Sequence, residues 1–183
     1  MTAQIRLGPA GPEHVPWLVE VESEPSGRVF LGHIGADYHH RWLLDPDIEQ
    51  VIGVTEDQEP AGFVVLAGLH SPDRSIEVRR IVLAADFRGR GLGRALLRAA
   101  LEHSEQTHRA SRVWLDVKPE NATARNLYDS EGFTSFGSTP DPLDPSQALI
   151  LMERLANTPR TPDENGLTHA RETSHPGPGQ SRA

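Results

Sequence analysis

The sequence IEVRRIVLAADFRGRGLGRALLR, residues 76–98, decides the fold of this chain. It begins with apolar and β-branched residues that predict a strand ending near Ala84. A basic loop rich in glycine follows, and apolar residues at helical spacing then predict a helix from about Leu92. Anions bind at a helix start, where N–H groups are unpaired, and arginines match phosphate oxygens. The stretch therefore predicts a phosphate-binding loop.

The spacing of the glycines narrows the choice of phosphate ligand. The sequence lacks the G-x-x-x-x-G-K-[ST] run of a Walker A loop. The glycines are Gly89, Gly91 and Gly93, and Arg94 stands where a third Rossmann glycine would fall. The pattern Arg-Gly-x-Gly-x-Gly after a strand instead resembles the pyrophosphate loop of the GCN5-related N-acetyltransferases, the GNAT superfamily, which bind acetyl-coenzyme A. The plainer alternative is a glycine-rich turn with a solvated basic edge.

Composition limits the remaining classes of protein. The chain has 183 residues, 37% of them hydrophobic, which suits one domain with a core of ordinary size. The absence of cysteine excludes disulfides, thiolate metal sites and a cysteine nucleophile. A net charge of −8 argues against general nucleic-acid binding. We find no apolar run of membrane-spanning length and no signal peptide, so we expect a cytoplasmic protein that does not bind a membrane.

The other patterns predict one α/β domain, residues 1–156, and a disordered tail, residues 157–183, because the composition changes there to small, polar and charged residues. The order strand, helix, strand implies that the central strand is parallel to the strand at 112–118, with the ligand at their carboxyl ends. The helix at 36–44 is expected to turn Tyr38, Trp42 and Leu43 inward. The remaining predicted elements are a short strand at 5–7, a helix at 12–24, a hairpin of strands 50–55 and 62–69, a helix at 119–129, and strands 133–136 and 148–155.

A second motif is NATARNLYDSEGF, residues 121–133, which is similar to the GNAT segment Asn-x-x-Ala-x-x-x-Tyr-x-x-x-Gly-Phe. Asn121 can cap the helix while facing a ligand, and Gly132 can close it. Tyr128 lies one turn beyond Ala124 and can point its hydroxyl toward the neighbouring strand ends. The alternative is a capped amphipathic helix with a core tyrosine.

The resemblance covers about residues 5–155 and implies an α/β fold, with a GNAT-like mixed twisted sheet of about seven strands flanked by helices. It implies that acetyl-CoA lies where the central strand and the strand at 112–118 splay apart. Many members have a proline where Ala85 stands, so the turn is expected to be less rigid here. The cofactor-binding residues implied by position are Ile81, Val82 and Leu83 for the pantetheine arm, Arg88, Gly89, Arg90, Gly91, Leu92, Gly93 and Arg94 for the pyrophosphate, and Asn121 and Tyr128 for the thiol end.

The resemblance implies an N-acetyltransferase that moves an acetyl group from acetyl-CoA to a primary amine of a small molecule or a protein N-terminus by direct attack. The backbone N–H of Val82 or its neighbour is the candidate donor to the oxyanion, and Tyr128 is the candidate acid. Glu77 is the candidate base, acting through ordered water because it lies about 13 Å along the strand from Ile81. Its alternative roles are a solvated carboxylate or a partner of Arg79. Asp116 is a weaker candidate base, and some members use none.

Other functions stay open at this point. The main alternative is a catalytically silent acyl-CoA-binding or sensing module, while a nucleotide-binding protein is disfavoured by the glycine spacing. We expect no metal, because His39 and His40 are adjacent on a helix and cannot face one site. The first two helices cover the acceptor groove in this family, so acceptor-site roles are open for His33, Glu22 and Glu24. A homodimer is an open option for assembly.

Overall fold

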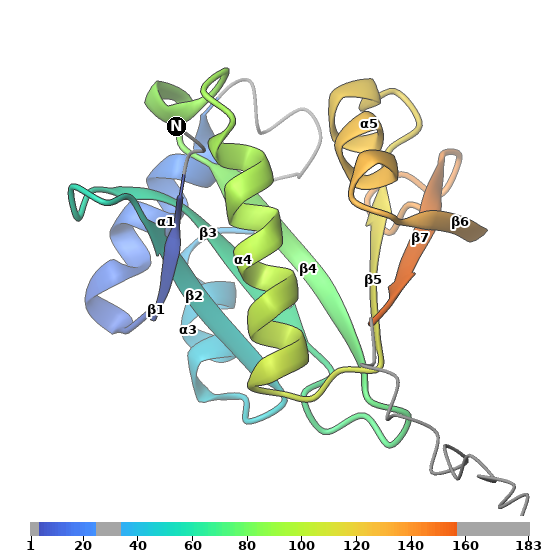
Figure 1. The fold of residues 1–183 in the computed structure, drawn as a ribbon, viewed down its shortest axis with the longest axis horizontal. Coiled ribbons are helices and arrows are strands. Elements are labelled where there is room, and N and C mark those ends of the chain that lie inside the picture. Colours follow the sequence, from blue (N-terminus) through green and yellow to red (C-terminus); the bar gives the residue numbers. More distant parts are fainter. Residues whose placement is uncertain (1–3, 25–33, 157–183) are drawn as a thin grey trace, which may run out of the picture.

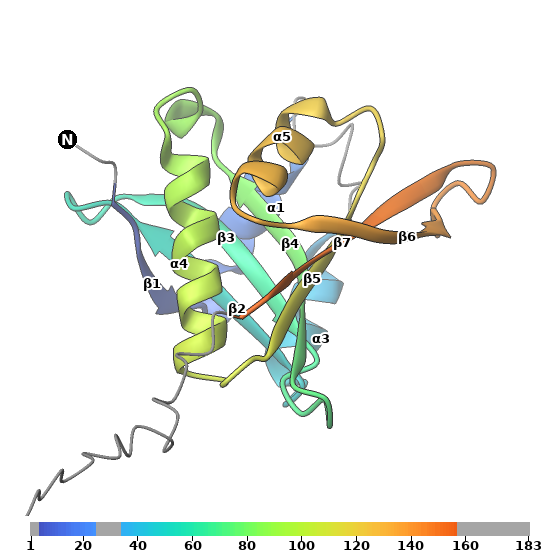
Figure 2. The ribbon, with the colours of Figure 1, turned by 45° about the vertical axis from the view of Figure 1, so that its right-hand side comes forward.

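The computed structural model describes residues 4–24 and 34–156. The described strands form one seven-stranded sheet in the order β1-β2-β3-β4-β5-β7-β6 (Figure 1), and Figure 2 shows its strong twist. Among these strands, every neighbouring pair is antiparallel except β4 and β5, which are parallel as the sequence predicts. The strands are β1 Arg6–Pro9, β2 Ile48–Val54, β3 Pro60–Ala67, β4 Ser75–Leu83, β5 Arg112–Val117, β6 Thr134–Pro140 and β7 Ala148–Leu155.

Helices cover both faces of the sheet, with α4 and α5 on one face and α1 and α3 on the other (Figure 1). The α-helices are α1 Val15–Ser23, α3 Ala36–Leu44, α4 Leu92–Gln106 and α5 Ala122–Ser130, and short 3-10 helices span Pro12–His14 and Ala85–Phe87. Side chains of β3 alternate between the two layers, so Val64 packs in the core with α4 while Phe63 packs in the core with α1. The predicted α/β sheet flanked by helices is confirmed.

The helix α3 has the bounds that the sequence predicts, but the prediction that Tyr38 faces inward is wrong. Tyr38 is 45% exposed, and His39 is buried in its place. The His39 ring lies 5.7 Å from the rings of both Trp42 and Phe63. A polar imidazole can occupy this position because both of its nitrogens have partners, as described below.

Two predictions fall on residues that the structure does not describe. The disordered tail, residues 157–183, and the candidate acceptor residue His33 lie outside the described ranges. Within those ranges, none of the helices is long and apolar enough to cross a membrane.

Candidate active site

The strands β4 and β5 separate soon after they begin. Their parallel pairing is limited to Ser75 with Arg112, Ile76 with Val113 and Glu77 with Trp114. Beyond Glu77 the two strands diverge toward the end where α4 begins (Figure 1). The edge of β4 that faces β5 therefore has no strand partner among the described residues, and its backbone groups can pair with an extended ligand.

The predicted pantetheine-binding segment lies on this open edge. Val82 is buried in the core beneath α1, while Ile81 and Leu83 pack toward the core beneath α4. The side chains therefore occupy both faces of the sheet, and the peptide groups remain at the edge.

A β-bulge interrupts β4 just before that segment. Val65 of β3 pairs with Arg80, and the next residue, Leu66, pairs with Val78, so Arg79 is the extra residue. Bulges change the direction of side chains and often lie beside functional sites. Here the bulge lies between the part of β4 that pairs with β5, residues 75–77, and the part whose edge toward β5 is open.

The glycine loop connects β4 to the start of α4. Gly89 and Gly91 have φ values of 71° and 78°, which non-glycine residues rarely adopt. Apart from the adjoining backbone, no atom of the described residues lies within 4 Å of the place that a Cβ would take at Gly89 or Gly91, and the nearest such atom at Gly93 is one of Leu83, at 4.0 Å. Gly91 is the N-cap of α4 and supplies no side-chain cap, so first-turn N–H groups remain available. Leu92 is buried, so only its backbone faces the loop.

The three predicted phosphate-binding arginines have different surroundings. Arg88 donates from Nε to the Leu83 oxygen at 2.9 Å and from Nη2 to Glu24 at 2.8 Å. Arg94 donates from Nη1 to the Ser130 hydroxyl at 2.9 Å and is paired with Glu131.

Arg90 makes looser contacts than the other two arginines. Its Nη1 lies 3.5 Å from the oxygen of Asp86, and its guanidinium lies 5.6 Å from the Phe87 ring. Arg90 and Arg94 are both exposed, but Arg94, like Arg88, also holds a neighbouring segment in place through an ion pair.

Helix α5, together with its N-cap, carries Asn121 and Tyr128 and lies on the β5 side of the gap between β4 and β5 (Figure 1). The Asn121 side chain accepts a hydrogen bond from the Ala124 N–H at 3.2 Å, which confirms the predicted cap. Gly132 follows the helix with a φ of 87°, as predicted. Tyr128 is buried, and its ring lies 5.7 Å from that of Phe133. Burial raises the pKa of Tyr128 to about 12, and the charge of Asp116 acts in the same direction, so the phenol keeps its proton near neutral pH.

The candidate bases lie on the face of the sheet opposite α4. Glu77 accepts from Nη2 and Nε of Arg79 at 2.7 and 3.1 Å, which is the structural role that the sequence left open for it. Part of the Asp116 side chain is exposed to solvent. The surrounding protein nevertheless removes water from its carboxylate, and this desolvation raises the pKa of Asp116. The charges of Glu77 and Asp141 raise the pKa of Asp116 further, against the opposite effect of nearby arginines.

A buried polar cluster behind the bulge was not found from the sequence. Oε1 of Glu22 on α1 lies 2.7 Å from Nη1 of Arg80, and the other carboxylate oxygen lies 3.3 Å from Nε2 of His39. Nδ1 of His39 lies 2.6 Å from Oε1 of Gln50 on β2. The cluster joins α1, α3 and β2 to the bulge. A sequence signal existed in Glu22, which lies four residues after Leu18 and therefore on the apolar face of α1.

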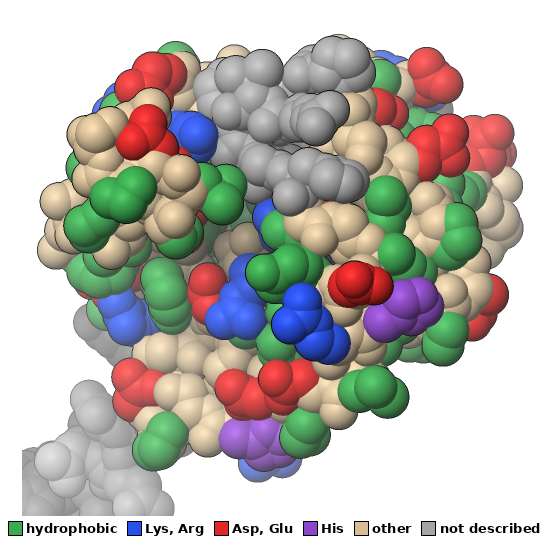
Figure 3. All heavy atoms as spheres, turned by 180° about the vertical axis from the view of Figure 1, so that it is seen from behind, with side chains coloured by type: hydrophobic (Ala, Val, Ile, Leu, Met, Phe, Trp, Pro, Cys, Tyr) green, Lys and Arg blue, Asp and Glu red, His purple; other side chains and the backbone are tan. Residues whose placement is uncertain are grey.

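A pocket of about 460 Å³ opens on the same face, beside Glu77. Figure 3 shows this face, on which acidic and basic side chains lie close together. The pocket has charged walls and an aromatic part, lined among others by Asp47, Asp73, Glu77, Arg79, Trp114 and Phe136.

Comparisons with known proteins agree with this geometry. Residues 14–133 match the acetyltransferase (GNAT) family. N-acetylaspartate synthetase of Rattus norvegicus is 35% identical over 92 residues, which are 50% of this chain and 30% of that protein. Mycothiol acetyltransferase of Corynebacterium glutamicum is 36% identical over 93 residues, which are 51% of this chain and 30% of that protein. The matched part is therefore less than a third of these relatives' length.

Solved structures share the fold over a larger part of the chain. Spermidine N-acetyltransferase from Vibrio cholerae, in complex with CoA and spermine, superposes with a TM-score of 0.73 at 20% identity. The superposition covers 83% of this chain and 95% of that one. A dodecameric structure of the same Vibrio cholerae enzyme superposes with a TM-score of 0.68.

Proposed function

The chain belongs to the acetyltransferase (GNAT) family, and from this premise we propose that it moves an acetyl group from acetyl-CoA to a primary amine. The acceptor is a small molecule or a protein N-terminus, and the amine attacks the thioester directly. The observation that carries the proposal is the open edge of β4 with the glycine loop at its end. That combination supplies an extended backbone for an amide-containing arm and an anion site at the next turn.

The residues of the loop fit a pyrophosphate. The bare surroundings of Gly89, Gly91 and Gly93 let a ligand approach the backbone closely. The first-turn N–H groups of α4 and the positive end of its dipole favour negative charge. Arg90 supplies an exposed guanidinium beside them. The peptide groups of Ile81 to Leu83 then support the pantetheine arm.

The chemistry requires one proton to leave the amine and one to reach the sulfur. The amine nitrogen forms a bond to the acetyl carbon, and the carbon–sulfur bond breaks as the amide forms. The Tyr128 phenol, held protonated by its raised pKa, donates to the leaving thiolate. A backbone N–H of a neighbour of Val82, at Ile81 or Leu83, stabilises the oxyanion, because the N–H of Val82 itself points toward β3.

The acceptor is proposed to enter from the face that carries Glu77 and Asp116. Both carboxylates lie on the side of the sheet away from α4, and either can receive the amine proton through water. The pocket beside Glu77 has acidic and basic walls, which suits a small polar amine better than an apolar one. The acceptor-site roles of Glu22 and Glu24 are not part of this proposal, because Glu22 is buried against Arg80 and Glu24 holds Arg88.

Release of free thiol from acetyl-CoA in the presence of a panel of primary amines tests the proposal. The panel should include polyamines, amino acids and peptides with free N-termini, and the protein should be the full chain. Acetyl-CoA should also raise the melting temperature more than NAD or ATP does. Binding without turnover on any amine would favour the silent module, and stronger stabilisation by NAD or ATP would contradict the proposal.

A further inference from the structure

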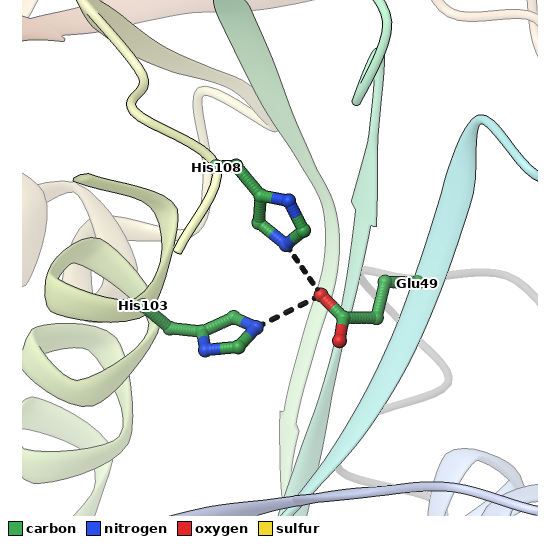
Figure 4. A group of neighbouring side chains, drawn as sticks. All are labelled: Glu49, His103 and His108. Atoms are coloured by element: carbon green, nitrogen blue, oxygen red, sulfur yellow. Dashed lines mark hydrogen bonds and ion pairs between the residues drawn. The ribbon is translucent and has the colours of Figure 1, made fainter. Parts of the chain in front are cut away.

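A second cluster of chemically active side chains lies at the end of α4 remote from the glycine loop. Glu49 comes from β2, His103 from the last turn of α4, and His108 from the loop before β5. Nε2 of His103 lies 2.8 Å and Nε2 of His108 lies 2.6 Å from the same oxygen, Oε2 of Glu49. Figure 4 shows both rings pointing these nitrogens toward the carboxylate. Because His103 lies 12 residues beyond Gly91, the N-cap of α4, the cluster is about 18 Å from the glycine loop along the helix.

The three side chains offer the donor atoms that borderline metal ions prefer. One ligand atom from each lies within 4.8 Å of the other two. Zinc bound to imidazole and carboxylate at about 2.0–2.1 Å needs donors roughly 3.3 Å apart in a tetrahedron. Each nitrogen–oxygen separation would therefore widen by about half an ångström, which rotation of the flexible Glu49 side chain can provide.

The surroundings of the cluster also suit a cation. Nδ1 of His103 lies 3.2 Å from the Thr107 hydroxyl, which can accept a hydrogen bond from Nδ1–H and so leave Nε2 as the ligand atom. The side chains of Glu49, His103 and His108 are 28%, 23% and 18% exposed, so water can reach a further coordination position. The negative end of the α4 dipole adds to the attraction of the carboxylate for positive charge.

We propose that Glu49, His103 and His108 form a site for Zn²⁺ or a similar divalent first-row transition ion, with water as the fourth ligand. The ion would join three segments that are distant in sequence: β2, the last turn of α4 and the loop that leads into β5. Its function is to fasten the end of α4 to the sheet. The site is separate from the one proposed for acetyl transfer and does not depend on it.

The hydrogen bonds within the cluster could exist without any ion, so the experiment has to distinguish a metal site from a cluster that is only hydrogen-bonded. Glutamine keeps a side-chain N–H that can donate to Glu49 but is a poor zinc ligand. The variants are therefore His103→Gln and His108→Gln. His70→Gln is the matched control, since Nδ1 of His70 lies 3.4 Å from a carboxylate oxygen of Asp47 at an exposed pair outside the cluster.

Untagged full-length protein, stripped with a chelator, is titrated with ZnCl₂ by calorimetry and with CoCl₂ by visible absorption. We expect one ion per chain, the visible band of four-coordinate Co²⁺, and a rise in melting temperature with Zn²⁺. His103→Gln and His108→Gln should each weaken binding about tenfold or more, while their melting temperatures in chelator stay near that of the wild type. The proposal is overturned if the wild type shows no saturable binding, or if His70→Gln weakens binding as much as the two test variants.

Discussion

Glu22 of α1 and Arg80 of β4 form an ion pair between that helix and the sheet, with Oε1 and Nη1 2.7 Å apart and both side chains buried. The two atoms meet as charges and not in the directed geometry of a hydrogen bond, so we treat the contact as electrostatic. Burial lowers the pKa of Arg80, against the charges of Glu22 and Asp116, which raise it. The Glu22 carboxylate therefore stabilises the positive charge of Arg80, which lies next to the bulge and beside the candidate site.

Removing the charge of Glu22 should destabilise the protein strongly. In Glu22→Gln the Arg80 guanidinium stays buried without its counter-ion, which typically costs about 3–5 kcal/mol. Urea unfolding of the two proteins measures the difference in the free energy of unfolding. Glu13→Gln, at an exposed carboxylate, is the control and should change it very little. A loss from Glu22→Gln no larger than that of the control would contradict the importance of the pair.

Removing the Tyr128 hydroxyl should lower the rate of acetyl transfer while leaving acetyl-CoA binding almost unchanged. Tyr128→Phe keeps the ring that packs near Phe133, and the lost acid should lower kcat by about 10²–10⁴-fold. The exposed Tyr38 provides the control substitution, Tyr38→Phe, which should not affect kcat. Measurement with a good acceptor amine is required. An unchanged kcat in Tyr128→Phe would rule out the acid role.

The pH dependence of Glu77→Gln should distinguish a base from a structural carboxylate. If Glu77 receives the amine proton, the rate should fall at neutral pH and recover as the pH rises, because free amine then forms without help. If Glu77 serves only to hold Arg79, the profile of kcat against pH should keep its wild-type shape. Steady-state rates across the pH range, with one amine throughout, decide between these outcomes.

Adding one methyl group at Gly93 should weaken CoA binding without lowering the stability of the protein. Gly93 lies in the first turn of α4, and Leu83, at 4.0 Å, is the nearest protein contact for an added Cβ. Gly93→Ala should therefore leave stability unchanged or raise it by up to about 1 kcal/mol, while the methyl group obstructs a pyrophosphate at the loop. Gly8→Ala, also with open surroundings, is the control for calorimetric titration with CoA. Wild-type CoA affinity in Gly93→Ala would place the pyrophosphate elsewhere.

Asp116→Asn should raise stability at neutral pH but not in acid. Desolvation by the surrounding protein raises the pKa of the Asp116 carboxyl in the folded state, and the negative charges of Glu77 and Asp141 raise it further. The folded protein then binds more protons than the unfolded chain, and Asp116 costs stability as the pH rises through its folded pKa. Melting temperatures of both proteins should differ at pH 7 and converge below the ordinary pKa of aspartate. A lower melting temperature for Asp116→Asn at pH 7 would contradict this.

Local sequence information was sufficient for most of the fold. The glycine loop and the apolar run before it specify β4 and α4, because turn chemistry and periodicity act over few residues. The prediction failed where tertiary contacts dominate. Tyr38 and His39 are adjacent on α3, and only the buried Glu22 and Gln50 explain why the histidine faces inward.

Convergence of distant residues was equally hidden in the sequence. Glu49 and His103 are 54 residues apart, and they meet because α4 packs across the sheet with its last turn near β2. In the same way, Arg88 was expected to serve a phosphate, but its pairing with Glu24 depends on the position of α1. Patterns within one element cannot encode such distances.

The short pairing of β4 with β5 also has a consequence for the lifetime of the protein in a cell. The ladder between β4 and β5 has three residue pairs, so opening between these strands breaks few backbone bonds. A co-substrate that bound both sides of the gap would suppress this opening by mass action. Proteases attack chains through such partly opened states. The enzyme would then be degraded more slowly, and its abundance would rise, when acetyl-CoA is plentiful.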